Sequence, residues 1–237
     1  MSGHSHWAGI KHKKAAQDAK RANVFTKVAR LVTLAAKDGG DPATNFKLRL
    51  AIDQARSVNM PKENIERAVR RGTGELKDQA TIEEIVYGAM VPENIAMLIK
   101  VTTDNKNRTL GEIRNIVERS GGKMVPAGSF NHLFRQVGTI YTVTSPENAN
   151  DIELKAIDAG AVDTIFQREL LQIITDPRDL KEIKENLEKK GISIDSAGLI
   201  YVPLSPLEVD SETKIDYEKL LAQLDAQDDV QEIYDNL

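Results

Sequence analysis

The spacing of hydrophobic positions divides the chain at residue 82 into a helical part and a part that mixes strands with helices. Before that point, apolar residues recur every three or four positions, which predicts amphipathic helices. The three stripes are Val24, Val28, Leu31, Val32 and Ala35, then Leu48, Ile52 and Ala55, then Ile65, Ala68 and Val69. Three helices joined by short loops indicate a small bundle over residues 1–75.

Glycine and proline mark the ends of these helices. Gly39-Gly40 ends the first helix, and Asp41-Pro42 is expected to cap the second, with proline in the first turn where its missing N–H does no harm. Pro61 begins the third helix and Gly72 ends it. The stretch 73–80 has the composition of a linker to the next part of the chain.

From residue 82 the apolar residues alternate, as they do in a half-buried strand. Residues 85–91 follow this pattern, and Ile95–Val101 is a short apolar run suited to a central strand. The pair Thr109 and Glu112 has the spacing of a capping box, and Gly121-Gly122 ends the helix that this box would begin. The segment therefore predicts two strands followed by a helix.

The same order of elements recurs near the end of the chain. Residues 162–169 and 170–175 are expected to be strands, Asp176-Pro177 to cap a helix that ends at Gly191, and 192–202 to be extended. Two α+β modules follow, each ferredoxin-like with helices over one face of a sheet. A last helix near Leu220 and a last strand near Val230 are expected to complete the middle module, which alone has too few strands.

The fold class predicted from these patterns is α+β and multidomain: an N-terminal three-helix bundle plus two α+β modules. The expected domains are residues 1–80 for the basic bundle, 81–131 with 203–237 for the middle domain, and 132–202 for an inserted domain.

Charge is distributed very unevenly between these parts. The first 71 residues hold 15 Lys and Arg against 6 Asp and Glu, whereas the other 166 hold 17 against 30, so a net charge of −4 hides segments of +9 and −13. A concentrated positive segment on an acidic protein is typical of a protein that binds a polyanion. The acidic modules would repel the same polyanion, which makes them candidates for contact with a protein partner.

Composition narrows the classes of protein to which the chain could belong. Hydrophobic residues make up 41% of the chain, which suits folded domains, and cysteine is absent, which fits a reducing compartment. No stretch approaches the length of a membrane helix, and the basic N-terminus lacks the apolar region of a secretory signal. A cytoplasmic protein that does not enter a membrane is expected.

Catalytic signatures are missing. Neither a dinucleotide fingerprint nor a P-loop occurs, and Gly72-Thr73-Gly74 follows a helix rather than a strand. Three of the four histidines lie in the basic start, and His132 is isolated. We therefore expect no enzyme, no catalytic residues, no cofactor and no metal site.

The strongest candidate for binding is the basic N-terminal segment. Its members are Lys11, Lys13, Lys14, Lys20 and Arg21, preceded by Trp7. Their cationic groups can neutralise phosphates and release counterions, and an indole can stack on a base. The alternative is a solvated basic helix with Trp7 packed as a small core anchor.

A second cationic patch lies on the third helix. Arg67, Arg70 and Arg71 are spaced to share one face, which could enter a groove of nucleic acid as in helix-turn-helix proteins. The alternative is an ion-pair face within the helix, with Glu63 and Glu66 as partners. The second helix also carries positive charge, less concentrated, on Lys47, Arg49 and Arg56.

Several separate motifs in order resemble the YebC family across essentially the whole chain. They are GHSHWAGIKHKKAAQDAKRAN, FTK, DGGDPATN, NMPKENIERAVRRGTGEL, TDNKNRT and GSF. The resemblance implies a helical bundle and two α+β domains, the last inserted in the middle one. Two departures stand out: His6 replaces a common lysine, and Val91–Asn94 replaces a glycine-rich turn, where a plain hairpin is still expected.

The resemblance also implies a function. Bacterial members are cytoplasmic and commonly labelled probable transcriptional regulators, whereas mitochondrial relatives activate translation of cytochrome c oxidase and some bacterial relatives are linked to the ribosome. The sequence thus predicts a nucleic-acid-binding regulator of gene expression that acts as a DNA-binding transcriptional regulator. A ribosome-associated RNA-binding translation factor is the alternative. The motifs NMPKENIERA and TDNKNRT indicate a nucleic-acid surface or a contact between domains, without fixing which.

Overall fold

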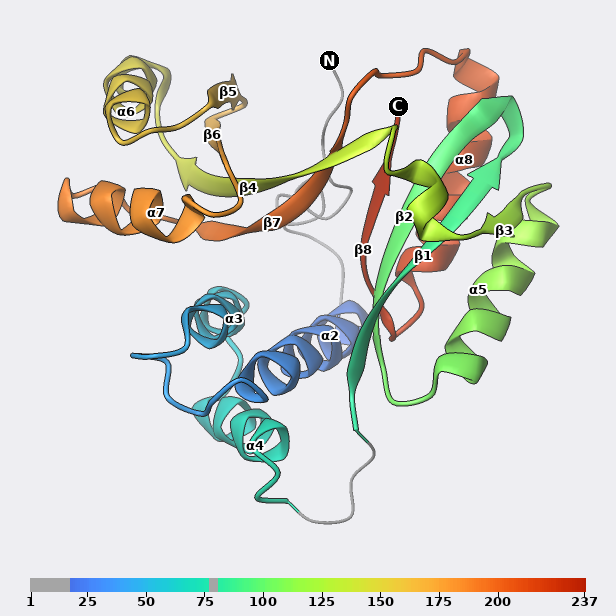
Figure 1. Ribbon diagram of the computed structural model, residues 1–237, viewed down its shortest axis with the longest axis horizontal. Coiled ribbons are helices and arrows are strands. Elements are labelled where there is room, and N and C mark those ends of the chain that lie inside the picture. Colours follow the sequence, from blue (N-terminus) through green and yellow to red (C-terminus); the bar gives the residue numbers. More distant parts are fainter. Residues whose placement is uncertain (1–17, 77–80) are drawn as a thin grey trace. The chain divides into compact units, whose positions relative to one another are not determined.

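The computed structural model describes residues 18–76 and 81–237 (Figure 1). They form two compact units. The first runs to Arg135 and resumes at Val202–Leu237, and the second is Gln136–Tyr201.

The first unit begins with the predicted three helices. They are α2 (Asp18–Ala36), α3 (Phe46–Ser57) and α4 (Lys62–Gly72). Their apolar stripes meet in one core, in which Val32, Leu48 and Ala55 are fully buried. The helical periodicity of the sequence therefore predicted both the elements and the faces that pack.

The start of α3 differs from the prediction. Asn45, not Asp41-Pro42, caps this helix: its side-chain oxygen accepts a hydrogen bond from the Leu48 N–H at 3.0 Å. Its amide nitrogen donates to the carbonyls of Ala35 at 2.7 Å and Gly39 at 2.8 Å, so one buried side chain also closes the loop from α2. Asp41 instead accepts from the Ala43 N–H in a turn.

Helices α2 and α4 approach closely at Gly72. A Cβ atom added at Gly72 would lie 2.2 Å from the Thr33 carbonyl oxygen and 2.6 Å from the Ala36 Cβ. Only glycine fits this crossing, which holds the C-terminal end of α4 against α2.

The rest of the first unit is a four-stranded antiparallel sheet in the order β3-β1-β2-β8. Its elements are β1 (Glu83–Val91), the short helix η1 (Pro92–Asn94), β2 (Ile95–Thr103), α5 (Lys106–Arg119), β3 (Lys123–Val125), η2 (Ala127–Phe130), α8 (Ser211–Asp225) and β8 (Val230–Asp235). Helices α5 and α8 pack beside each other against the sheet (Figure 1), and Ile99, Ile113 and Leu224 lie in their common core.

Two details of this sheet bear on the predictions. The expected hairpin is present, since β1 and β2 pair from Glu83 opposite Thr103 to Val91 opposite Ile95. The last strand, β8, pairs antiparallel with β2, so the end of the chain supplies an edge strand of this sheet. The sequence pattern missed β3.

The second unit contains two successive strand–helix–strand segments. Its elements are β4 (Phe134–Val143), α6 (Pro146–Asp158), β5 (Asp163–Gln167), β6 (Leu170–Thr175), α7 (Leu180–Lys189) and β7 (Ser196–Pro203). The sheet order is β5-β6-β4-β7, and β6 pairs antiparallel with both neighbours in this order, β5 and β4, which is the ferredoxin-like arrangement. The predicted α+β class is confirmed, although the sequence pattern missed β4 and α6.

Candidate nucleic-acid interface

The predicted basic residues fall into two groups in the structure. Trp7, Lys11, Lys13 and Lys14 lie outside the described residues. Lys20 and Arg21 belong to α2, and only their place in the helix is described. The second patch, on α4, lies within the described residues.

The arginines of α4 do not form the alternative ion-pair face. The Glu66 carboxylate lies 3.6 Å from the Lys62 ammonium, and within the described ranges neither Glu63 nor Glu66 pairs with Arg67, Arg70 or Arg71. This leaves three cations on one short helix without a carboxylate partner among the described residues.

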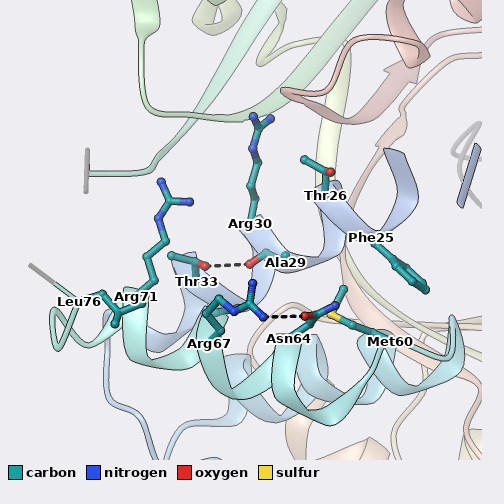
Figure 2. Close-up of a pocket in the computed structure, with 11 residues that line it drawn as sticks. Phe25, Thr26, Ala29, Arg30, Thr33, Met60, Asn64, Arg67, Arg71 and Leu76 are labelled. Carbon is teal, nitrogen blue, oxygen red and sulfur yellow. Dashed lines mark hydrogen bonds between the residues drawn. The ribbon is translucent and has the colours of Figure 1, made fainter. Parts of the chain in front are cut away.

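Two of these arginines border a cavity between α2 and α4 of about 370 Å³ (Figure 2). Its lining is Phe25, Thr26, Ala29, Arg30 and Thr33 from α2, and Met60, Asn64, Arg67, Ala68, Arg71 and Leu76 from α4 and its flanks. In Figure 2, Arg67 and Arg71 rise from α4 toward α2, which carries Arg30. Arg70 is exposed and does not line the cavity. The predicted patch is thus split between a cavity wall and the outer surface.

The guanidinium groups of Arg67 and Arg71 have few hydrogen-bond partners among the described residues. Arg67 donates to the side-chain oxygen of Asn64 at 3.3 Å, a weak contact between neighbouring turns. The Arg71 Nε atom is buried and has no hydrogen-bond partner among the described residues. Leaving a buried N–H without an acceptor costs about 1–3 kcal/mol, and no hydrogen bond among the described residues offsets this cost.

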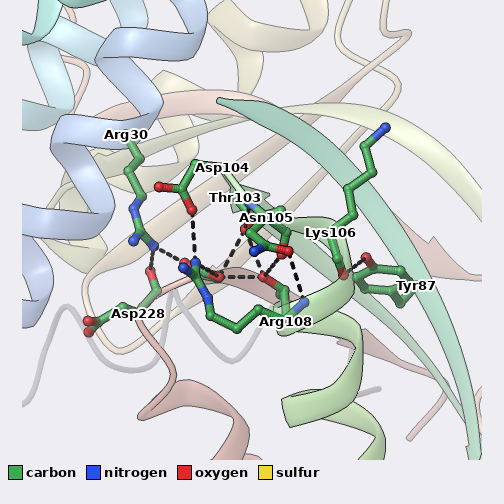
Figure 3. A network of polar contacts seen from close by, with 10 residues as sticks. Arg30, Tyr87, Thr103, Asp104, Asn105, Lys106, Arg108 and Asp228 are labelled. Carbon is green, nitrogen blue, oxygen red and sulfur yellow. Dashed lines mark hydrogen bonds and ion pairs between the residues drawn. The ribbon is translucent and has the colours of Figure 1, made fainter. Parts of the chain in front are cut away.

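Arg30, by contrast, has a carbonyl and a carboxylate as partners. One of its terminal nitrogens donates to the Asp228 carbonyl at 2.6 Å and to the carboxylate of Asp229. The Asp229 side chain is only 6% exposed, and Arg108 reaches its other oxygen at 2.9 Å. The hydroxyls of Thr103 and Thr109 complete what we call the Asp229 cluster (Figure 3).

The electrostatics of this cluster favour the charged carboxylate. Burial alone raises the pKa of Asp229, but hydrogen bonds from Thr109 and Arg108, the charge of Arg30 and a bond from Thr103 outweigh it. The net pKa of Asp229 lies below the ordinary value for an aspartate.

The Asp229 cluster explains the TDNKNRT motif, residues 103–109. Asn105 caps α5 by accepting from the Arg108 N–H at 3.1 Å, so the predicted capping box at Thr109 is wrong. Thr109 lies inside the helix, 1% exposed, and bonds to Asp229 instead. Thr103, Arg108 and Thr109 of the motif thus share Asp229 with Arg30 of α2, while residues 104–108 are exposed.

Further contacts join α2 to the turn between α8 and β8. Lys27 is 7% exposed and its ammonium donates to the carbonyl and the carboxylate of Asp225 at 2.6 and 2.9 Å. The amide nitrogen of Asn23 donates to the Ala226 carbonyl at 3.3 Å. One side of α2 is therefore fixed to the acidic part of this unit while another side faces α4.

Basic residues of α3 are occupied locally. The Lys47 ammonium lies 3.2 Å from Asp38, and Arg56 lies 3.7 Å from Asp53. The guanidinium of Arg49 stands over the ring of Phe46, 5.3 Å from its centroid. None of these residues lines the α2–α4 cavity.

The sequence patterns did not single out Arg30, nor the other α2 residues that line the cavity. Phe25, Ala29 and Thr33 recur at helical spacing beside the predicted core stripe of α2, which is the one signal that was available. Pairing that face with α4 required the packing of the bundle.

Other kinds of site are not found in the described parts of the chain. Across 18–76 and 81–237 no three His, Cys, Asp or Glu side chains are arranged to hold a metal ion. No helix among these residues is long and apolar enough to cross a membrane.

Comparison with known proteins shows the family to which the chain belongs. Residues 5–75 match the family described as TACO1/YebC protein N-terminal domain, and residues 82–237 match the one described as TACO1/YebC second and third domain. The chain belongs to the TACO1/YebC family.

Curated relatives match over the whole of this chain and nearly the whole of their own. A "Probable transcriptional regulatory protein" of Persephonella marina is 46% identical over all of this chain and 95% of its own. The "Probable transcriptional regulatory protein TTE1135" of Caldanaerobacter subterraneus is 44% identical over all of this chain and 98% of its own. Among solved structures, the conserved hypothetical protein Aq1575 of Aquifex aeolicus superposes with a TM-score of 0.88 at 41% identity, covering 98% of this chain and 96% of that one.

Proposed function

We propose that this protein is a nucleic-acid-binding regulator of gene expression that acts in the cytoplasm as a DNA-binding transcriptional regulator. The observation that carries the proposal is the arginine surface of α4, where Arg67, Arg70 and Arg71 have no carboxylate partner within the described ranges. Cations that the protein leaves unpaired are available to phosphates. The names of the full-length relatives support regulation of transcription.

In this proposal the three predicted domains divide the work. The basic bundle, 1–80, contacts phosphates through Lys11, Lys13, Lys14, Lys20 and Arg21, with Trp7 against a base or sugar and the α4 arginines as a second patch. The middle domain, 81–131 with 203–237, and the inserted domain, 132–202, are acidic and would orient the molecule or bind a protein partner.

Salt dependence of DNA binding tests the proposal. Neutralising Lys13, Lys14 and Lys20 together to Gln should weaken binding, because fewer phosphates are neutralised and fewer counterions are released. The slope of log affinity against log salt should become shallower by about 0.9 for each phosphate that the variant no longer neutralises. Fluorescence anisotropy with labelled duplex DNA at several salt concentrations gives both quantities.

A matched control removes the same charge elsewhere. Lys181, Lys189 and Lys214 are exposed lysines of the acidic part, and changing them to Gln should leave the affinity and the salt slope unchanged. Equal effects of the two triple variants would contradict the proposal. Ultraviolet crosslinking in cells then separates the targets, since crosslinks concentrated in ribosomal RNA would instead favour the translation-factor alternative.

A further inference from the structure

We infer that the α2–α4 cavity binds one unpaired nucleotide of a nucleic-acid strand, with its phosphate on Arg67 and Arg71 and its base in the apolar part. This inference rests on the proposed function and gives one surface of the bundle a defined ligand. Its basis is the coincidence of unpaired cations and apolar side chains around a single cavity.

The phosphate subsite follows from the two arginines of α4. Arg67 and Arg71 are four residues apart, so both project from one face of the helix. Arg71 keeps a buried Nε–H without an acceptor in the described structure, and Arg67 contacts only Asn64 there. A phosphodiester has several oxygens, and each of these two guanidinium groups can donate to them in a fork.

Arg30, on α2, lies at the edge of the phosphate subsite. Although it lines the cavity, its charge is compensated by Asp229, to which it is hydrogen-bonded. Arg30 therefore forms part of one wall of the cavity and adds little net attraction for the phosphate. The phosphate is expected nearer to α4 than to α2.

The rest of the cavity suits a base rather than a second anion. Phe25, Met60 and Leu76 contribute apolar surface, and Ala29 and Ala68 leave space between the helices. Bases without a pairing partner stack on aromatic side chains and on arginine planes, which Phe25 and Arg67 offer. Inorganic phosphate would leave this apolar surface unused.

Size excludes a paired base. A volume of about 370 Å³ lies at the lower end of the range for small-molecule sites, roughly 300–1,000 Å³, and accommodates one nucleotide. A base pair held in a double helix cannot enter without leaving its partner. The cavity thus selects single strands, loops or flipped bases, whereas the basic segment contacts phosphates of any strand.

Affinity measurements with single and double strands test this inference. Single-stranded DNA, single-stranded RNA and duplex DNA of about 10 nucleotides are compared by anisotropy against wild type, Arg71→Gln and Arg70→Gln. Arg70 is the matched control because it carries the same charge on the same helix but lies outside the cavity. Arg71→Gln should weaken single-strand binding about tenfold and duplex binding no more than Arg70→Gln does. The two single strands show whether the site prefers ribose or deoxyribose.

A second variant fills the cavity without changing charge. Thr26 is exposed and lines the cavity, so Thr26→Trp should fold normally, as circular dichroism can verify, and should weaken single-strand binding only. A strand containing 5-iodouracil should crosslink to Phe25 or Met60 in wild type and lose this crosslink in the variant.

The outcomes separate this inference from the proposed function. Equal losses for Arg70→Gln and Arg71→Gln on every ligand, or competition by inorganic phosphate as strong as by a nucleoside monophosphate, would overturn the nucleotide site and leave general phosphate contact intact. Absence of binding to any nucleic acid by wild type would instead overturn the proposed function.

Discussion

Two neighbouring arginine groups in the first unit differ in how the protein satisfies them. In the Asp229 cluster, Arg30 and Arg108 share one buried carboxylate, which also contacts two threonine hydroxyls. In the α2–α4 cavity, Arg67 and Arg71 have no carboxylate partner within the described ranges. The comparison shows that the residue type does not decide whether an arginine is neutralised within the protein. The presence of a buried counter-charge does.

Removing the carboxylate should have the largest effect on stability. Asp229→Ala leaves Arg30 and Arg108 without their shared partner, so we expect a loss of about 3–5 kcal/mol in the free energy of unfolding. Urea denaturation followed by circular dichroism measures it. Asp228→Ala is the control, since Asp228 is exposed and contacts Arg30 through its carbonyl, and it should change stability by less than about 0.5 kcal/mol. Similar losses for both variants would contradict a structural role of the Asp229 carboxylate.

Helices α2 and α4, which line the cavity, approach closely at Gly72, and this contact offers the next test. Gly72→Ala places a methyl group against the Thr33 carbonyl and should destabilise the bundle by about 1–3 kcal/mol. Gly111→Ala is the matched helical control, because nothing lies within 4 Å of the added Cβ, and it should stabilise by about 0.5–1 kcal/mol. Thermal unfolding of the two variants should therefore shift in opposite directions. A stabilised Gly72→Ala protein would mean that α2 and α4 are not packed so closely.

Low pH should reduce the contribution of the Asp229 cluster to the free energy of unfolding and should not act on the cavity. The pKa of Asp229 is depressed in the folded protein, so the unfolded chain binds this proton more readily. The stability that Asp229 contributes is fully present above the ordinary pKa of about 3.9 and is lost as pH falls through the lower folded pKa. The loss should be smaller than that of Asp229→Ala, because the protonated carboxyl still accepts hydrogen bonds.

The comparison protein for this measurement is Asp229→Asn. Asp176 and Asp210 also have lowered pKa values, through Arg178 and the start of α8, and they titrate in both proteins. The difference in unfolding free energy between wild type and Asp229→Asn should shrink as the pH falls below about 3.9. A constant difference would show that Asp229 is not charged in the cluster.

The smallest loss of stability is expected in the cavity. Arg71→Met removes a buried N–H that has no partner in the described structure and keeps the apolar stem, so stability should not fall and should rise by up to about 1–3 kcal/mol. Arg108→Met removes a partner of Asp229 and should cost about 1–3 kcal/mol. Urea denaturation compares them directly. A larger loss for Arg71→Met would assign Arg71 a structural role.

Apolar periodicity predicted those elements whose hydrophobic faces are decided locally. The stripes of α2, α3 and α4 pack as expected, and β6 has the predicted bounds, Leu170–Thr175. Prediction of the helix caps failed where a contact outside the helix decided between two candidate residues. Asn45 rather than Asp41 caps α3 because its amide also reaches the Ala35 and Gly39 carbonyls, and Asn105 rather than Thr109 caps α5 because Thr109 is drawn to Asp229.

The candidate site was predicted only in part for a related reason. The spacing of Arg67 and Arg71 placed them on one helix face, but nothing in that spacing excluded Glu63 and Glu66 as partners. The cavity itself needs Phe25 and Ala29 from another helix. The basic N-terminal residues, Trp7 to Lys14, lie outside the described structure, and their role stays a prediction.

The amino-acid sequence by itself determined the uneven charge, the apolar faces of the helices and the α+β class, because these depend on residues close together along the chain. The tertiary structure alone decided which arginines are neutralised. Arg30 and Asp229 are 199 residues apart in sequence and meet only when β8 pairs with β2. Charged groups interact most strongly over a few ångströms in space. The pattern of residues close together along the chain does not show which residues far apart in sequence will become such neighbours.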